Sequence, residues 1–406
     1  MKPVSKKRAD PTFLSLFSGC GGMDAGFLAA GFRPVAAYDI DAAAAASYRH
    51  NFRTPCHEVD LQNWKELLPS LDEADVIVAG PPCQGFSLAG PRRQNDPRNS
   101  LLSIPARLAA YLPVRALVIE NVPGALAEPH RRYWRETERL LHQAGFGTRT
   151  IIIDAQSVGL PQTRKRVFLL ALRGHTPEGI DELHLDAPVP LREVLPVPSS
   201  AHNHFPESLA LDSREYKIAV RIAQGQKLSN VRASGAAIHT WDIPEVFGAV
   251  TSPERAVLEF VLRRRRQARR RDRGDADPVR LSDLREQFGE AGVLLVTALV
   301  AKRYLRRRGR SFVDLTQTFN GKYRRLDLNR PTHCVLTRFC DPTYFLHPTE
   351  HRPLTVREAA RIQGFSDSFL FHGSPSAQAR QIGNAVPPAL ARVVAQSLRL
   401  QLMTAS

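Results

Sequence analysis

Residues 76–87 read Val-Ile-Val-Ala-Gly-Pro-Pro-Cys-Gln-Gly-Phe-Ser. The four apolar residues predict a buried strand, and the two prolines fix φ just before Cys83, while Gly85 permits a sharp turn after it. A strand-end loop of this kind lies at the carboxyl edge of a sheet, where open α/β folds place their active sites. A lone cysteine can also be a small core residue, but a packed thiol needs no such stiff frame. We therefore interpret Cys83 as a residue presented for chemistry.

Further apolar runs occupy residues 13–17, 35–40, 116–120, 150–153 and 167–171. Segments of helical length separate most of them, and this alternation predicts βαβ units and an α/β fold with a mostly parallel sheet. The last two runs are expected to form a hairpin-like edge.

Composition indicates a folded protein with room for two lobes, because the chain has 406 residues of which 43% are hydrophobic. No apolar run reaches 18 residues, and the basic residues 1–8 precede no apolar segment. We expect neither a membrane span nor a signal peptide, and a cytoplasmic location. The five cysteines form no Cys-x-x-Cys pair, so free thiols and no metal are expected.

Positive charge is concentrated in one part of the chain. The formal net charge is +16, and residues 251–325 contain 20 Lys and Arg against 9 Asp and Glu. Such an excess is typical of a phosphate-binding surface, although a single basic helix can equally be a solvated face. The distribution predicts a nucleic-acid partner.

Prolines become frequent after Pro177, which indicates a crossing between lobes near residue 185. We expect a catalytic, cofactor-binding lobe from residues 1–185 and 376–406. A second lobe spans 186–328, and residues 329–375 return to the first.

The second lobe is expected to contain a helix from Glu254 to about Arg271, started by Thr251-Ser252-Pro253. Two more helices are predicted at 281–288 and 291–308, followed by a strand at 312–315. This order resembles a winged helix, in which the last helix would enter the major groove, and a generic small helical lobe is the other interpretation.

Five segments then resemble, in order, the motifs of the cytosine-5 DNA methyltransferases. They are 13–27 (Phe-Leu-Ser-Leu-Phe-Ser-Gly-Cys-Gly-Gly-Met-Asp-Ala-Gly-Phe), the Pro82-Cys83 loop, Glu120-Asn121-Val122, Gln162-Thr163-Arg164-Lys165-Arg166 and Gly383-Asn384-Ala385-Val386. A sixth is Leu354 to Phe365. The resemblance covers roughly the first 175 and the last 75 residues, and the middle is not covered. It implies a Rossmann-like S-adenosylmethionine-dependent methyltransferase lobe and a smaller target-recognition lobe.

The resemblance implies that Cys83 adds to carbon 6 of cytosine, so that carbon 5 can accept a methyl group. Glu120 would hydrogen-bond or protonate ring nitrogen 3, although a strand-end carboxylate can also cap a helix. Arg164 and Arg166 alternate with Lys165, so both guanidinium groups are expected to point the same way and to clamp the base oxygen and phosphates.

The glycine loop after the first strand does not match Gly-x-Gly-x-x-Gly, which argues against NAD. Asp39 is expected to contact ribose hydroxyls and Asp60 the adenine amine, with a helix cap as the competing interpretation of Asp60; Asp41 is expected to cap the next helix. The implied cofactor is S-adenosylmethionine, with S-adenosylhomocysteine as product. The expected cofactor-binding residues are Phe17, Ser18, Gly19, Cys20, Gly21, Gly22, Asp39, Ile40, Asp60, Leu61, Pro82, Asn384, Ala385 and Val386.

The expected partner is double-stranded DNA, from which the target cytosine must be flipped out. The resemblance assigns no base-reading residue, so DNA contacts are expected from charge and position alone. They are Gln84, Ser87, Arg263, Arg264, Arg265, Arg266, Arg303, Arg306 and Arg307. We expect a monomer acting on nucleoid DNA, and a genetic partnership with a restriction or other defence system stays open.

Two other functions are compatible with the same motifs. One branch of the family modifies transfer RNA cytosine, and the large basic insert argues against it. An inactive DNA-binding regulator on this scaffold is the other, and the intact Cys83, Glu120, Arg164 and Arg166 argue against that.

Overall fold

The protein is described by a computed structural model, which covers residues 10–67, 74–82, 97–178, 189–230, 236–267 and 276–404. Its chain forms two compact units. Unit 1 comprises Met1–His204, Asn329–Arg338 and Thr355–Ser406, and unit 2 comprises Phe205–Leu328 and Phe339–Leu354.

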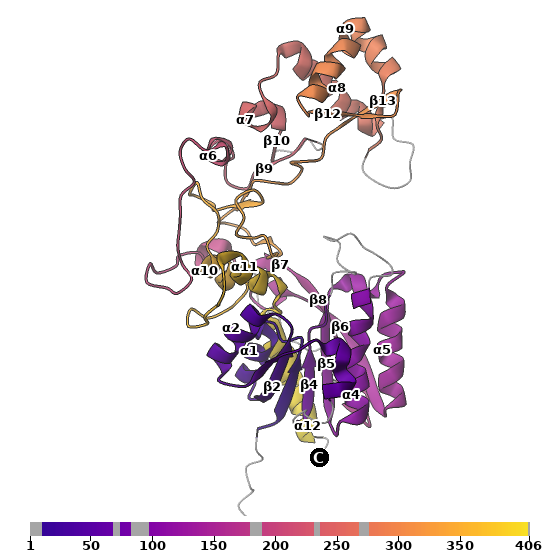
Figure 1. Cartoon of the computed structure of the whole chain (residues 1–406), viewed down its shortest axis with the longest axis vertical. Helices are drawn as coiled ribbons and strands as arrows, with labels where there is room; N and C mark the ends of the chain where they lie inside the picture. Colours follow the sequence, from indigo (N-terminus) through magenta and orange to yellow (C-terminus); the bar gives the residue numbers. More distant parts are fainter. Residues whose placement is uncertain are drawn as a thin grey trace, which may run out of the picture. The chain divides into compact units, whose positions relative to one another are not determined.

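Unit 1 is built on a seven-stranded sheet with the order β3-β2-β1-β4-β5-β8-β6 (Figure 1). Neighbours from β3 to β5 are parallel, whereas β8 is antiparallel to both β5 and β6. The predicted α/β fold, its mostly parallel sheet and its hairpin-like edge are confirmed. The strands are β1 (Thr12–Leu16), β2 (Arg33–Asp39), β3 (Cys56–Glu58), β4 (Val76–Ala79), β5 (Ala116–Asn121), β6 (Phe146–Asp154) and β8 (Lys165–Arg173).

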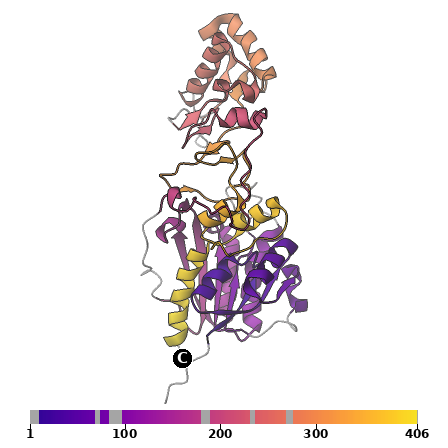
Figure 2. The same ribbon diagram turned by 90° about the vertical axis from the view of Figure 1, so that its left-hand side faces the viewer.

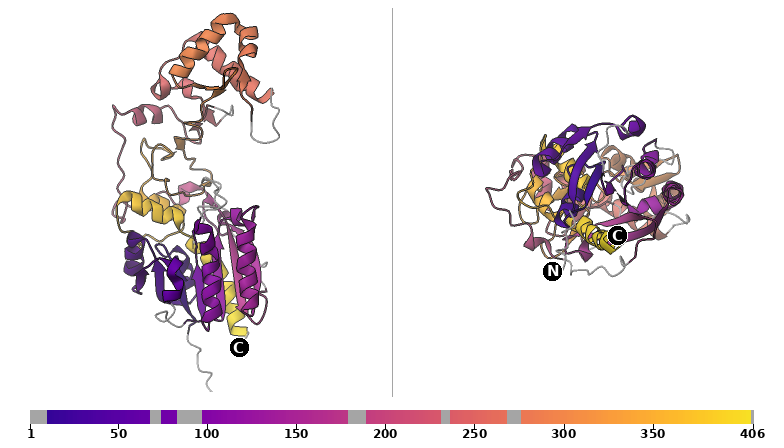
Figure 3. Two further views of the ribbon diagram at one scale, coloured as in Figure 1. Left: turned by 45° about the vertical axis from the view of Figure 1, so that its right-hand side comes forward. Right: turned by 90° about the horizontal axis from the view of Figure 1, so that it is seen from below.

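Helices cover both faces of this sheet. On one face α4 and α5 lie beside each other (Figure 3), and on the other α1 packs against the C-terminal helix α12, which runs along the sheet (Figure 2). The helices are α1 (Gly22–Ala29), α2 (Ala42–Phe52), α3 (Trp64–Leu67), α4 (Ile104–Tyr111), α5 (Arg131–Gln143) and α12 (Pro388–Thr404).

Burial on both faces explains why the central strands are continuous apolar runs. In β4, Ile77 and Ala79 belong to the core under α4 and α5, while Val76 and Val78 belong to the core under α1 and α12. Side chains of a strand alternate between faces, so a sheet covered on both sides needs apolar residues at every position.

Helix ends follow the expected local signals. Asp41 Oδ1 accepts hydrogen bonds from the backbone N–H groups of Ala43 (3.0 Å) and Ala44 (3.1 Å), so its predicted role as the cap of α2 is confirmed. Gly145, with φ 83°, follows α5 in the left-handed conformation that ends many helices.

The unit boundaries differ from those expected. Residues 189–204 belong to unit 1, because Arg361 donates to the Val194 carbonyl and Arg357 to the His202 carbonyl. Residues 355–375 also belong to unit 1, whereas 339–354 belong to unit 2. The remaining elements of unit 1 are β7 (Gln162–Thr163), β15 (Thr332–His333), α10 (Val356–Ile362) and α11 (Pro375–Asn384).

Unit 2 has its own hydrophobic cores, one of which lies among α8, α9 and the sheet β11-β13-β12. Its elements are α6 (Arg214–Ala219), β9 (Lys227–Leu228), β10 (Ala237–Ile238), α7 (Pro244–Phe247), α8 (Ser252–Gln267), β11 (Val279–Arg280), α9 (Leu281–Ala301), β12 (Leu305–Arg308), β13 (Phe312–Leu315), β14 (Arg324–Arg325) and β16 (Phe345–Leu346).

The expected helix over 291–308 is wrong at its end. Helix α9 stops at Ala301, and residues 305–308 form β12, because Leu305 pairs with Leu315 and Arg308 with Phe312 across an antiparallel hairpin. Gly289, with φ 64° and ψ −165°, interrupts α9, so two helical segments precede the hairpin. The described part of the first basic helix, α8, ends at Gln267, and residues 268–275 lie outside the described residues.

Candidate active site

Glu120 and Arg166 form a shielded ion pair at the carboxyl end of the central strands. Glu120 lies near the end of β5, and Arg166 lies on the adjacent β8. Arg166 Nε is 2.8 Å from Glu120 Oε1, and the two side chains are only 12% and 10% exposed. Burial raises the pKa of the Glu120 carboxyl above its usual value, while Arg166 and Arg164 oppose that rise. A carboxyl with a raised pKa is suited to donate a proton or a hydrogen bond.

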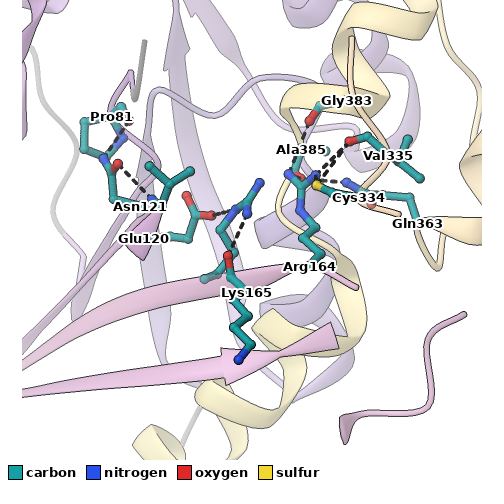
Figure 4. A network of polar contacts seen from close by, with 12 residues as sticks. Pro81, Glu120, Asn121, Arg164, Lys165, Cys334, Val335, Gln363, Gly383 and Ala385 are labelled. Atoms are coloured by element: carbon teal, nitrogen blue, oxygen red, sulfur yellow. Dashed lines mark hydrogen bonds and ion pairs between the residues drawn. The ribbon is translucent and has the colours of Figure 1, made fainter. Parts of the chain in front are cut away.

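Asn121 connects this strand to the cysteine loop. Its Nδ2 donates to the Pro81 carbonyl at 3.2 Å, and its Oδ1 accepts from the Val122 backbone N–H at 2.9 Å (Figure 4). The start of the loop is thereby tied to the strand that carries Glu120. Cys83, Gln84 and Ser87 lie outside the described residues, so their expected roles stay predictions.

Arg164 does not share the surroundings of Arg166. Its residue is 2% exposed, and its guanidinium donates to the carbonyls of Val335 (2.9 Å), Gly383 (3.2 Å) and Ala385 (2.8 Å) (Figure 4). Nη1 also lies 3.1 Å from Cys334 Sγ. Burial lowers the pKa of this guanidinium to about 10, which still leaves it charged at neutral pH. The expected pair of arginines with a common direction is not observed, because the Arg164 guanidinium is bonded to backbone carbonyls of distant segments.

Two buried glutamines extend this network. Gln162 Nε2 donates to Gln363 Oε1 at 2.6 Å, and Gln162 Oε1 accepts from the Val335 backbone N–H at 3.1 Å. Gln363 Nε2 in turn donates to the carbonyls of Ile382 (3.0 Å) and Ala385 (2.8 Å). Gln363 was not expected as a site residue, and its position in an apolar helix-end segment was the only signal. The network joins the arginine segment to the turn after α11.

The glycine loop between β1 and α1 is held by Asp39. Asp39 Oδ2 accepts from the Gly19 backbone N–H at 2.7 Å, and Oδ1 accepts from the Asp41 N–H at 2.8 Å. Burial raises the pKa of Asp39, and these two N–H groups oppose the rise. Because the loop follows β1 and Asp39 ends β2, both lie at the carboxyl edge of the sheet with Ser18 and Phe17.

Two glycines of this loop have no room for a side chain. A Cβ on Gly21, whose φ is 92°, would lie 2.2 Å from the Phe52 ring, and one on Gly22 would lie 2.4 Å from the Val386 carbonyl oxygen. The C-terminal turn at Ala385 and Val386 therefore lies directly against the loop, as expected for residues of one site. Asn384, at the end of α11, is exposed.

The neighbouring strand end carries the other expected cofactor residues. Asp60 Oδ1 accepts from the Gln62 backbone N–H at 2.9 Å, so it caps the short 3-10 helix Leu61–Asn63. This is the competing interpretation of Asp60, and it leaves the second carboxylate oxygen available. Leu61 is buried, whereas Ile40 is 71% exposed beside Asp39.

Cys20 contributes its backbone, not a reactive thiol. The residue is 1% exposed, and burial raises the pKa of its thiol to about 12. The nearby Asp24 is also fully buried, and it accepts a hydrogen bond from the Tyr48 hydroxyl at 2.8 Å. Burial raises the pKa of the Asp24 carboxyl to about 6. Neither Asp24 nor Tyr48 was expected as a site residue.

The arginines expected to bind DNA divide into two groups. Arg265 is buried and bonded to Asp314, so in this structure it has no surface to offer DNA; Arg264 and Arg306 are paired with Asp283 and Asp314. The exposed members are Arg263, Arg266, Arg303 and Arg307.

Within the described ranges, no three His, Cys, Asp or Glu side chains are grouped so that they could hold a metal ion. No helix of those ranges has the length and apolar character needed to cross a membrane.

Comparison with known proteins gives a family match over most of the chain. The family model described as C-5 cytosine-specific DNA methylase matches residues 11–399. The type II methyltransferase M.AgeI of Thalassovita gelatinovora is 30% identical over 96% of this chain and 99% of its own length. M.DdeI of Desulfomicrobium norvegicum is 28% identical over 95% of this chain and 88% of its own length.

Solved structures support the same fold. A DNA modification methyltransferase encoded within an E. coli prophage aligns with a TM-score of 0.59 and 24% identity, covering 97% of this chain and 99% of that one. The S. pombe Dnmt2 methyltransferase aligns with a TM-score of 0.55 and 14% identity over 98% and 99% of the two chains. At these identities the likeness concerns the fold alone.

Proposed function

The chain belongs to the C-5 cytosine-specific DNA methylase family and is a DNA (cytosine-5-)-methyltransferase, and from this premise we propose its reaction and the roles of its residues. The reaction transfers a methyl group from S-adenosylmethionine to carbon 5 of a cytosine within a short sequence of double-stranded DNA. The observation that carries the proposal is the shielded Glu120–Arg166 pair, joined through Asn121 to the start of the Cys83 loop.

Cytosine carbon 5 is a poor nucleophile until a thiolate adds to carbon 6. We assign this addition to Cys83, whose sulfur forms a bond to carbon 6 and is expelled when the carbon 5 proton leaves. The addition requires electron withdrawal toward ring nitrogen 3. Glu120 supplies it by donating to that nitrogen, and its raised pKa favours the protonated form that donation requires.

The two arginines have different tasks in this proposal. Arg166 holds the Glu120 carboxyl in position and retains donors for the base oxygen. Arg164 is a positioning residue, because its guanidinium bonds to backbone carbonyls on two other segments and not to substrate. The clamp role inferred from the family is therefore proposed for Arg166 alone.

The residues at the carboxyl edge fit S-adenosylmethionine, which when bound supplies an electrophilic methyl group. Gly21 and Gly22 keep the loop free of side chains where the Val386 turn approaches. Asp39 has lone pairs left for ribose hydroxyls after accepting from Gly19 and Asp41. The exposed Ile40 and the second oxygen of Asp60 are placed for the adenine ring and amine.

The target base must leave the helix to reach Cys83, at a cost of roughly a few kcal/mol that DNA contacts offset. We assign target recognition to unit 2. The protein is proposed to act as a monomer on nucleoid DNA, and a restriction or other defence system remains an open genetic partner.

Expression in a host that lacks cytosine methylation tests the reaction. Bisulfite sequencing of the host DNA should reveal protected cytosines at one short recurring sequence. Protection confined to transfer RNA would support the RNA-modifying alternative, and no protection together with sequence-specific DNA binding would support the inactive regulator.

The nucleophile is tested separately with 5-fluorocytosine at the target position. The native chain should form a covalent complex that survives denaturation, since fluorine cannot leave as the proton does. Cys83→Ser should bind the same duplex without trapping it, because a hydroxyl is a far weaker nucleophile than a thiol at neutral pH. Trapping by Cys83→Ser at the native level would assign the attack to another residue.

A further inference from the structure

Unit 2 contains a compact module of helices and a hairpin that holds itself together. Helix α8, strand β11, the two segments of α9 and the hairpin β12–β13 share one hydrophobic core that includes Val261, Leu284, Val296 and Val313. Strand β13 lies between β11 and β12 and is antiparallel to both. Figure 1 shows α8, α9, β12 and β13 together as one group.

Acidic residues inside this module are already paired. Asp314 is 4% exposed and accepts from Arg265 (2.5 Å) and Arg306 (3.0 Å), while Asp283 accepts from Arg264 (2.9 Å). These pairs link α8 to α9 and to the hairpin, so they stabilise the module and are not available to a ligand.

The hairpin carries a second set of arginines that lack such partners. We define the wing surface as Arg280, Arg307, Arg308 and Arg310, all of which are exposed. Among the described residues none of the four has a carboxylate within ion-pair distance. Arg280 and Arg308 lie directly opposite Phe312 on either side, so the three side chains share one face of the sheet. Arg310 lies in the turn, after Gly309 with φ 66°.

The helix next to the hairpin has a different surface. After Gly289, the exposed residues of α9 are Glu290, Ala291, Leu294, Thr297, Ala298 and Ala301. Base edges in the major groove are read chiefly by Arg, Lys, Asn and Gln, and this face contains none of them. An acidic residue and an exposed leucine are poorly suited to a surface that meets phosphates.

We propose that the wing surface, and not the second segment of α9, binds the phosphate backbone of double-stranded DNA. A two-stranded hairpin fits a DNA groove, and arginines without carboxylate partners release counterions when they meet phosphates. DNA as the partner rests on the proposed function. The wing surface adds which element makes the contact, and it differs from the helix expected from the order of elements.

The test uses the full chain and a fluorescent duplex of about 30 base pairs, long enough to hold the target sequence with flanks on both sides. Binding is measured by anisotropy at several salt concentrations for the native chain and for R307Q/R308Q/R310Q. The slope of log affinity against log salt should fall by roughly 0.9 for each lost contact, or roughly 2.7 for three. A slope equal to the native one would overturn the proposal.

Three control variants distinguish phosphate binding by charge from the loss of side-chain shape and from a general loss of positive charge. R307K/R308K/R310K keeps the charges and should keep most of the slope, and a loss as large as in the glutamine variant would contradict phosphate binding by charge. R33Q removes an exposed charge at the amino end of β2 and should leave the slope unchanged. L294A/T297V on α9 should bind as the native chain does, and a loss of target discrimination there would return recognition to that helix.

Failure of this inference is distinguishable from failure of the proposed function. A native chain that methylates DNA with a wing variant of unchanged slope retains the function and refutes the wing surface. A native chain without methylation whose DNA affinity still depends on the wing refutes only the function. Tighter, equally wing-dependent binding to an RNA duplex would overturn DNA as the partner.

Discussion

Glu120 shows how one side chain can be tuned by two opposed effects. Burial favours its neutral form, and Arg166 at 2.8 Å favours its charged form, yet the pKa of the carboxyl is raised. Because burial is the larger effect, a proton is available for ring nitrogen 3 at a higher pH than an exposed glutamate would allow.

Glu120→Gln should slow methyl transfer by roughly 10²–10⁴-fold while S-adenosylmethionine affinity stays near native, because the amide cannot give up a proton and the glycine loop is untouched. Single-turnover methylation and calorimetric titration measure the two quantities. Asp39→Ala should show the reverse pattern, since it frees the Gly19 and Asp41 N–H groups. Equal loss of cofactor binding in both variants would contradict this division of roles.

Asp24 makes stability depend on pH. Its folded pKa of about 6 lies above the ordinary aspartate value of 3.8, so the folded chain binds the proton more tightly than the unfolded chain. Stability is highest below pH 4 for this group alone, and it falls as pH rises toward 6. The difference corresponds to about 3 kcal/mol above pH 7.

Asp24→Asn should remove that loss, because the amide oxygen can still accept from Tyr48 without a buried charge. Urea unfolding at pH 4 and pH 8 should show similar stability of the two proteins at the lower pH. At pH 8 the variant should be more stable by up to about 3 kcal/mol. A constant difference at both pH values would mean that Asp24 does not titrate in this range.

Among the elements, the turn after α11 depends on a side chain from a distant strand junction. Arg164 bonds to the carbonyls of Gly383 and Ala385, and Gln363 bonds to the same Ala385 oxygen. Since Val386 lies against Gly22, the network supports the cofactor loop from behind.

Arg164→Lys should therefore lower the free energy of unfolding by about 3 kcal/mol, because one ammonium cannot satisfy carbonyls on both segments. Weaker S-adenosylmethionine binding should accompany it. Arg166→Lys serves as the matched comparison, with near-native unfolding and slower methyl transfer. Combined with Gln363→Leu, Arg164→Lys should be non-additive by about 0.5–3 kcal/mol, and strict additivity would show that the shared oxygen does not couple them.

Elements with strong periodic signals could be predicted, and long-range charge pairing could not. The apolar runs at 76–79 and 116–120 coincide with β4 and β5 because both faces of those strands are buried. The basic run beginning at Arg263 contains surface and buried members alike, since Arg265 meets Asp314 only after the hairpin forms. Strand β12 was expected to be helical because its register depends on Phe312 and Leu315, which lie beyond it in sequence.

For the whole molecule, the important feature is that each unit has hydrophobic cores of its own. Leu170 belongs to a core of unit 1 and Leu258 to a core of unit 2, and both residues are fully buried. Because the two sets of cores share no residue, each unit can unfold without exposing the other's interior. The cofactor residues lie in unit 1 and the wing surface in unit 2.

Calorimetry should accordingly show two unfolding transitions. S-adenosylmethionine at about a hundred times its Kd should stabilise only the transition of unit 1, by about 2.7 kcal/mol. Leu170→Ala should lower that transition and Leu258→Ala the other, each by about 2–5 kcal/mol. A single transition that both variants lower and the cofactor raises would mean that the two units unfold as one, and cofactor binding would then stabilise the DNA-binding unit as well.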